Sequence, residues 1–166
     1  MVEWGPHPSE MYSRPNNLEE ILNFTEQNQD KMHKYVTKAE QVFGIAYQTM
    51  RNTLQNAYQQ STGYLKMLYG YASRLIENRT EKLLKVIDDL MGEVGPVNVI
   101  EVDKYIMGTN LLGMTFPNVK IPPIFLNKGQ GFMDKLETTV HELLHIKRPD
   151  LSEMEIRKLS EIYCNA

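Results

Sequence analysis

The sequence contains little that would place the protein in a membrane, outside the cell or on a nucleic acid. Its one cysteine, Cys164, allows no internal disulfide. The first residues lack the basic and apolar stretches of a signal peptide, and no apolar run is long enough to cross a bilayer. The net charge is −3 and basic residues form no block, so we expect neither nucleic acid nor a membrane as a partner. A cytoplasmic protein is the expectation.

Proline is also absent from a long stretch, residues 17–93, whose pattern is helical. Apolar or small residues recur there at steps mainly of three and four, from Val36 to Leu75, which is typical of a coiled-coil seam or of a helical hairpin. A further amphipathic segment follows at 82–91. Two interpretations stay open. The region is either an arm that binds a second copy or a partner protein, or a set of helices that packs on the rest of the chain.

The character of the sequence changes on either side of this helical region, which we place at residues 17–95. Residues 1–16 contain three prolines and are expected to form an irregular arm. The arm is either docked onto the body by Trp4 or a flexible tail. After Gly95-Pro96, β-branched residues at 97–102 predict a strand, and short strands are expected at 111–116 and 119–121. Residues 124–127 follow two prolines and should be an edge strand. The expected fold class is α+β, with a small sheet in a second domain at 96–166.

Recognisable chemistry is concentrated in His141, Glu142 and His145, which form the motif H-E-x-x-H. The motif lies on a predicted helix, because Met133, Leu136, Val140, Leu143 and Leu144 recur at helical spacing. Residues four apart share one helix face, so both imidazoles can bind one Zn²⁺. The carboxylate of Glu142 can then reach a metal-bound water but is poorly placed to ligate. The alternative is an amphipathic helix with two incidental histidines.

On this motif and the order of elements around it, residues 97–163 resemble a small zincin metallopeptidase of the gluzincin type, in the reduced form called minigluzincin. The resemblance implies a short sheet whose edge strand precedes the motif helix. It also implies a second helix that supplies a glutamate as the third zinc ligand. Substrate backbone would bind along the edge strand, here Ile124–Asn127.

The third ligand is expected from the segment that follows Pro149. Ser152 and Glu155 have the S-x-x-E spacing of a capping box, which predicts a helix beginning at Ser152. The apolar face of that helix is expected to contain Ile156, Leu159, Ile162 and Tyr163. Glu155 lies on the flank of this face and Glu153 points roughly away, so Glu155 is the expected ligand and Glu153 the second choice. Glu155 could instead only cap its own helix.

The expected function is hydrolysis of a peptide or protein substrate by a zinc metallopeptidase. Zn²⁺ would be held by His141, His145 and one glutamate, with Glu142 as general base. Tyr163 is the local candidate for a further donor to the oxyanion, although its apolar face favours a core position. The alternative is a non-enzymatic helical interaction or scaffold protein, in which the zinc site is structural, vestigial or absent.

Overall fold

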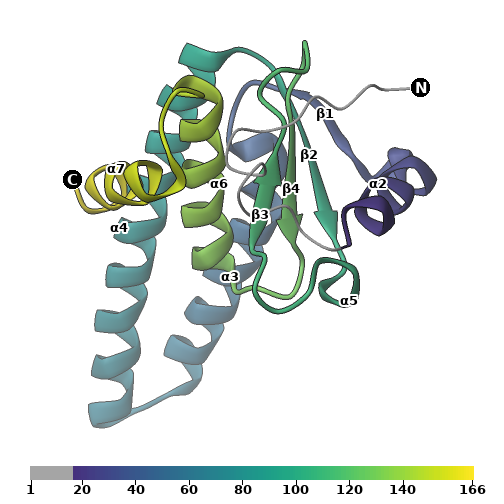
Figure 1. The fold of residues 1–166 in the computed structure, drawn as a ribbon. Helices are drawn as coiled ribbons and strands as arrows, with labels where there is room; N and C mark the ends of the chain where they lie inside the picture. Colours follow the sequence, from purple (N-terminus) through teal and green to yellow (C-terminus); the bar gives the residue numbers. More distant parts are fainter. Residues whose placement is uncertain (1–16) are drawn as a thin grey trace.

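A computed structural model describes residues 17–166, and these residues form the expected α+β fold (Figure 1). The arm expected at residues 1–16, and the role of Trp4, lie outside the described residues. In chain order the elements are α2 (Leu18–Gln27), η1 (Gln29–Lys31), β1 (His33–Val36), α3 (Glu40–Gln60), α4 (Gly63–Val94), β2 (Val97–Val102), α5 (Lys104–Met107), β3 (Gly113–Thr115), β4 (Pro123–Asn127), α6 (Phe132–Lys147) and α7 (Glu153–Asn165).

The helical region folds back on itself, because α3 and α4 form an antiparallel hairpin (Figure 1). The inner end of α4 packs along α6, and its buried side chains are Thr80, Leu83, Ile87, Leu90 and Met91. The region is not helical throughout, since β1 interrupts it and pairs antiparallel with β2. Only Val36 of β1 is buried, so the strand has no clear alternating pattern, and its hydrogen-bond partners lie more than 60 residues away.

The sheet has the strand order β1-β2-β4-β3, which corrects the expected position of residues 124–127. β4 is a central strand, parallel to β2 on one side and antiparallel to β3 on the other. Pro123 is compatible with this position because it is the first residue of the strand, where a missing N–H is tolerated. The edge strands are β1 and β3. The strand expected at 119–121 is a turn, and that expected at 111–116 is limited to β3.

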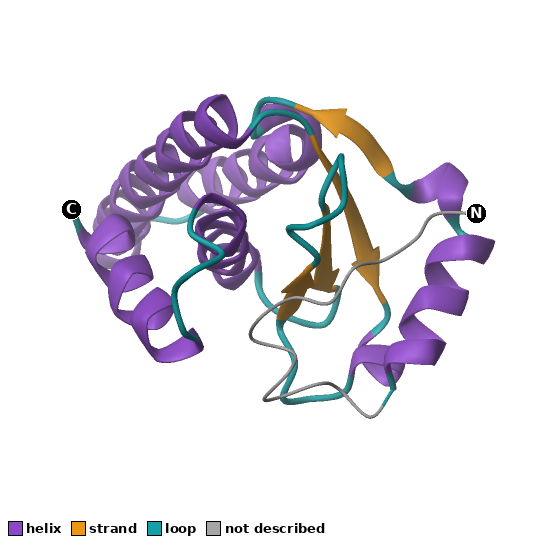
Figure 2. Ribbon diagram, turned by 45° about the horizontal axis from the view of Figure 1, so that its top comes forward, coloured by secondary structure: helices purple, strands orange, loops and turns teal. Residues whose placement is uncertain are grey.

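Helices cover both faces of the sheet (Figure 2). Alternating side chains of β2 and β4 point to α3, α4 and α6 on one face, and to α2 and α5 on the other. The first core contains buried residues from both sides of the boundary expected at residue 95, from Phe43 and Ile87 to Leu143 and Ile156. The helical region and the following segment therefore share one core. None of the helices in residues 17–166 is long and apolar enough to span a membrane.

The shared core predicts that damage to α4 will also loosen α6. Ile87→Ala removes a fully buried side chain and should lower the free energy of unfolding by about 2–5 kcal/mol. Amide hydrogen exchange should rise in α6 and β4 as well as in α3 and α4. Ile45→Ala is the control, because Ile45 is 86% exposed on α3, and it should change stability by at most about 0.5 kcal/mol. Faster exchange confined to α3 and α4 in Ile87→Ala would contradict a shared core.

Candidate metal centre

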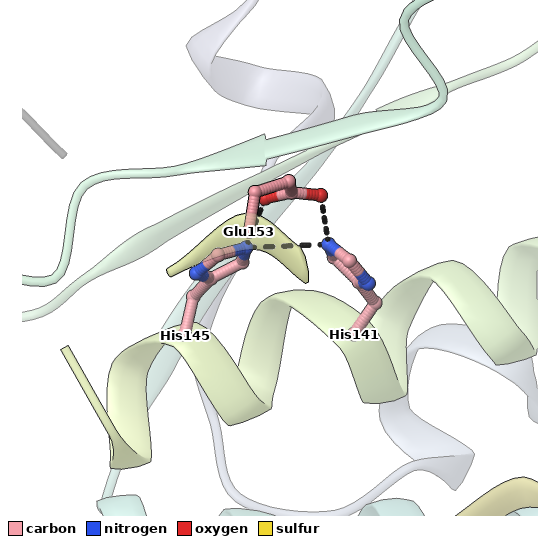
Figure 3. Close-up of side chains that lie close together, drawn as sticks. All are labelled: His141, His145 and Glu153. Atoms are coloured by element: carbon pink, nitrogen blue, oxygen red, sulfur yellow. Dashed lines mark hydrogen bonds and ion pairs between the residues drawn. The ribbon is translucent and has the colours of Figure 1, made fainter. Parts of the chain in front are cut away.

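The orientation of the motif helix α6 is set by its buried stripe. Leu136, Val140, Leu143 and Leu144 are fully buried in the core against the sheet and α4. α6 begins after Gly131, whose backbone is extended, and ends at Lys147, with Arg148 as its C-cap just before Pro149. With the stripe fixed in the core, His141 and His145 occupy a neighbouring face and point towards α7 and β3 (Figure 3).

The two histidines and Glu153 form one compact cluster (Figure 3). The Nε2 atoms of His141 and His145 are 3.2 Å apart. The Oε1 atom of Glu153 is 2.8 Å from Nε2 of His141, and its Oε2 atom is 2.7 Å from Nε2 of His145. Ligands around one tetrahedral Zn²⁺ lie about 3.3 Å apart, given Zn–N and Zn–O distances of about 2.0–2.1 Å. The three side chains therefore converge on a single point from two helices.

Each member of the cluster affects the charge of the others. Burial alone would raise the pKa of the Glu153 carboxyl, but its hydrogen bonds with His141 and His145 outweigh burial and hold the pKa well below the ordinary value. For His141, burial alone would lower the pKa. The hydrogen bond with Glu153 and the charges of Glu142 and Glu153 outweigh it, and the pKa of His141 is raised. Glu153 is thus an anionic carboxylate between two imidazoles, and a divalent cation that binds there would displace the proton that this arrangement favours on His141.

Glu142 lies beside this cluster but outside it. Its side chain is 5% exposed, and burial raises the pKa of its carboxyl despite the opposing influence of His141 and His145. Strand β3 passes close over it at Gly113, where a Cβ atom would lie 3.3 Å from Oε1 of Glu142 and 2.5 Å from Cγ2 of Thr138. A side chain at residue 113 would therefore separate β3 from α6. Glycine permits the close approach that covers Glu142.

These residues line a cleft of about 900 Å³. One wall is the segment from Gly108 to Thr115, which includes β3, and the others come from α6 and α7. His141, Glu142, His145 and Glu153 all reach it. The three clustered side chains and Glu142 therefore face a space large enough for a substrate, which is the openness of catalytic zinc sites and not of structural ones.

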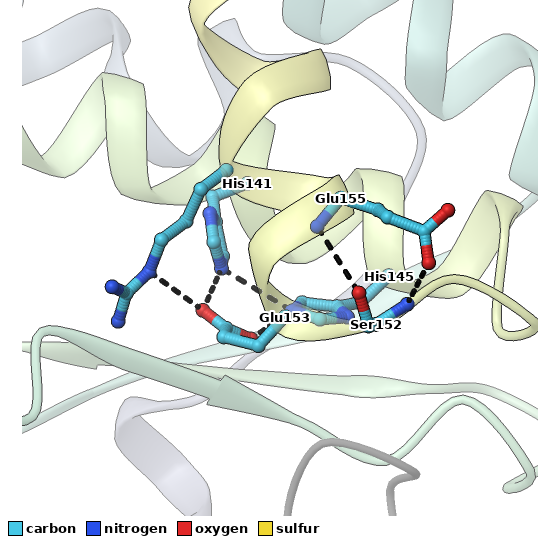
Figure 4. Close-up of polar contacts among 6 residues, drawn as sticks. His141, His145, Ser152, Glu153 and Glu155 are labelled. Carbon is cyan, nitrogen blue, oxygen red and sulfur yellow. Dashed lines mark hydrogen bonds and ion pairs between the residues drawn. The ribbon is translucent and has the colours of Figure 1, made fainter.

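Glu155 is not brought to the histidines, which corrects the expected ligand (Figure 4). The N–H of Glu155 donates to Oγ of Ser152, and Oε1 of Glu155 accepts from the N–H of Ser152, both at 3.2 Å. The expected capping box is thus confirmed, and it occupies the Glu155 carboxylate.

The reason for this correction is the face that α7 buries. Its buried residues are Ile156, Ser160 and Cys164, while Ile162 is 65% exposed. The spacing of three and four extends back from Ile156 to Glu153, which therefore lies on the inward face. The expectation that Ile162 lies on that face rests on its apolar side chain alone, and it is wrong. The positions that pack against the rest of the protein also hold the small residues Ser160 and Cys164. Their spacing from Glu153, in steps of three and four through Ile156, is the pattern in the sequence that indicates the inward face.

Tyr163 does not line the cleft, and its hydroxyl accepts from Nζ of Lys147 at 3.4 Å. Arg157 is the cationic side chain that the sequence reasoning missed. It follows Glu153 by one helical turn, lines the cleft, and places Nε 3.4 Å from Oε1 of Glu153. Its side chain is 73% exposed, so most of the guanidinium is free to meet a bound molecule.

Comparisons with models of protein families, with curated proteins and with solved structures give no match. The assignment of a ligand to the site therefore rests on the chemistry of its donor atoms. Two imidazole nitrogens and one carboxylate form the His₂Glu donor set of catalytic zinc sites, which leaves a fourth position for water or substrate. The residues present fit a Zn²⁺ ion.

Two isosteric substitutions separate the roles of the neighbouring glutamates. Glu153→Gln should weaken zinc binding at least about 100-fold, because it removes an anionic ligand. Glu155→Gln should retain zinc and lower stability by no more than about 1 kcal/mol through the weakened cap. Competition with a chelator measures zinc affinity, and thermal unfolding measures the cap. Zinc loss in Glu155→Gln with retention in Glu153→Gln would refute this assignment.

Proposed function

We propose that the protein is a zinc-dependent metallopeptidase that hydrolyses peptide bonds in a peptide or protein substrate. The observation that carries the proposal is the convergence of His141, His145 and Glu153 in an open cleft, with the buried carboxyl of Glu142 beside them. The resemblance of the H-E-x-x-H segment to gluzincins supports the same reaction. With Glu153 as the third ligand, the set is the His₂Glu set of such enzymes.

His141, His145 and Glu153 would hold the Zn²⁺. When bound, the ion supplies Lewis acidity towards water and the scissile carbonyl. Glu142 takes the proton from the attacking water and then gives it to the leaving amine. Burial raises the pKa of Glu142 above that of an ordinary glutamate, which strengthens it as a base and brings it closer to the operating pH.

Strand β3 supplies the surface for the substrate backbone. It is the edge of the sheet next to the cleft, and its outer side pairs with no strand among residues 17–166. A peptide can add there as a further strand, with its carbonyl groups directed over α6. The substrate position expected at Ile124–Asn127 thus moves one strand outward, because β4 is covered on both sides.

Arg157 is the donor best placed to stabilise the oxyanion. Its guanidinium lies in the cleft beside the metal ligands and is permanently charged. A positioned donor of this kind acts on charge that develops only in the transition state, so it raises kcat more than it lowers KM.

Glu142→Gln should retain one zinc per chain and lose turnover by about 10²–10⁴-fold, because the amide cannot accept the proton. Peptides from a whole-proteome digest are a suitable substrate mixture, with new termini identified by mass spectrometry. Unchanged cleavage in Glu142→Gln would refute the mechanism. Zinc binding with no cleavage of peptides or folded proteins by the wild type would favour the structural-zinc scaffold instead.

Arg157→Met should lower kcat by about 10²-fold, with zinc affinity and KM nearly unchanged, if Arg157 stabilises the oxyanion. Lys158→Met is the matched control, since Lys158 is exposed on the same helix and does not line the cleft. It should leave kcat unchanged. A fall in zinc affinity without a fall in kcat at saturating zinc would show that Arg157 only orients Glu153.

A further inference from the structure

The outer half of the α3–α4 hairpin stands away from both hydrophobic cores (Figure 1). The buried residue of α3 is Phe43, and those of α4 begin at Thr80, so both lie at the inner end. Between residues 44 and 79, Ser61 is the one buried side chain. Helices in proteins owe most of their stability to packing of an apolar face. Among residues 17–166, nothing gives this part of the hairpin such packing.

The contacts between the two outer helices do not replace that packing, because they include polar pairs and leave no apolar side chain between residues 44 and 79 buried. Tyr47 donates a hydrogen bond to Glu81 at 3.2 Å, and Arg51 pairs with Glu77 at 3.7 Å. A cavity of about 710 Å³ between the helices is lined mostly by polar side chains, including Gln48 and Asn52. Polar contacts and exposed ion pairs contribute little to stability.

The apolar side chains of the outer half instead face solvent along α4. We define the α4 stripe as five residues that are 42–71% exposed: Tyr64, Leu65, Leu68, Tyr71 and Leu75. Met67 is also exposed, but it lines the cavity between the helices and is not part of the stripe. Tyr64, Leu68, Tyr71 and Leu75 follow each other at steps of four, three and four, which is the a/d spacing of a helix–helix seam. Five side chains of this size at this exposure present roughly 500 Å² of apolar surface, towards the upper end of what monomers expose.

No charge interrupts the α4 stripe. Within its span the charged residues are Lys66 and Arg74, and both are directed towards α3. Nζ of Lys66 lies 4.9 Å from the ring centroid of Tyr58, and Arg74 lines the cavity between the helices. A second copy can therefore approach the stripe without bringing like charges together.

We propose that the α4 stripe is a homodimer interface, in which the hairpins of two copies pair about a two-fold axis to complete an antiparallel four-helix bundle. A seam with a/d spacing is complementary to itself, which is what an isologous contact requires. Two stripes would bury about 1,000 Å², which is about the size that a specific interface has to reach. The dimer gives the outer half of the hairpin the apolar packing that it lacks, and it does not depend on the proposed peptidase activity.

The first test is the mass of the full-length chain in solution, measured by sedimentation and light scattering over a wide concentration range. The wild type should have twice the 19.3 kDa of one chain. Leu68→Glu/Leu75→Glu should weaken the dimer at least about 100-fold, because it places charges in the seam. Ile45→Glu is the matched control: Ile45 is more exposed than any residue of the stripe but lies on α3, and its variant should remain dimeric.

A cross-linking test covers the case in which the double variant fails to fold. Tyr71 lies near the middle of the stripe and should meet its own copy across the axis, whereas Tyr64 lies at one end. Tyr71→Cys should therefore form a dimer through a disulfide under mild oxidation, while Tyr64→Cys and the wild type, with buried Cys164, should not.

Three results would overturn the proposal. If the wild type is monomeric at all concentrations, the stripe is not a homodimer interface, and a different protein or a lipid surface would be its partner. A dimer that survives the double substitution, or that dissociates equally in Ile45→Glu, would place the contact elsewhere. Absence of a Tyr71→Cys cross-link in a dimeric protein would show that the copies do not meet along the stripe.

Discussion

The burial of one face of α6 between the sheet and α4 is the constraint on which the site depends. Its buried leucines and Val140 fix the rotation of the helix about its own axis. The neighbouring face, which carries the histidines, is therefore directed towards the cleft. The histidines meet Glu153 because α7, which carries Glu153, also packs on α6. The three side chains of the candidate metal centre, from two helices, are thus positioned by apolar packing.

The cluster shows how environment separates identical functional groups. Glu142 and Glu153 are both partly or fully removed from water near the same histidines, yet their pKa values shift in opposite directions. Burial dominates for Glu142, whose carboxyl is covered by β3 at Gly113. Burial also raises the pKa of Glu153, but the hydrogen bonds and charges of the two imidazoles together outweigh it. One carboxyl is suited to exchange a proton and the other to remain an anionic ligand.

The long hairpin has two different parts. Its inner half supplies Leu83, Ile87 and Leu90 to the core behind α6, and so it supports the site directly. Its outer half presents Tyr64, Leu68 and related residues to solvent, and no apolar side chain between residues 44 and 79 is buried against α3. The same continuous helix α4 therefore links the metal centre to a surface suited to association, and a bundle formed there would extend away from the cleft.

The sequence by itself determined the features that depend on local spacing. The H-E-x-x-H helix, the capping box at Ser152 and Glu155, and the α+β class follow from periodicity and from contacts three or four residues apart. Only the tertiary structure decided which face of α7 is inward, and hence that Glu153 meets the histidines. It also decided that β4 is central and that His33–Val36 is a strand. The physical reason is that sheet hydrogen bonds and helix packing join residues far apart in the chain, where local pattern carries no information about partners.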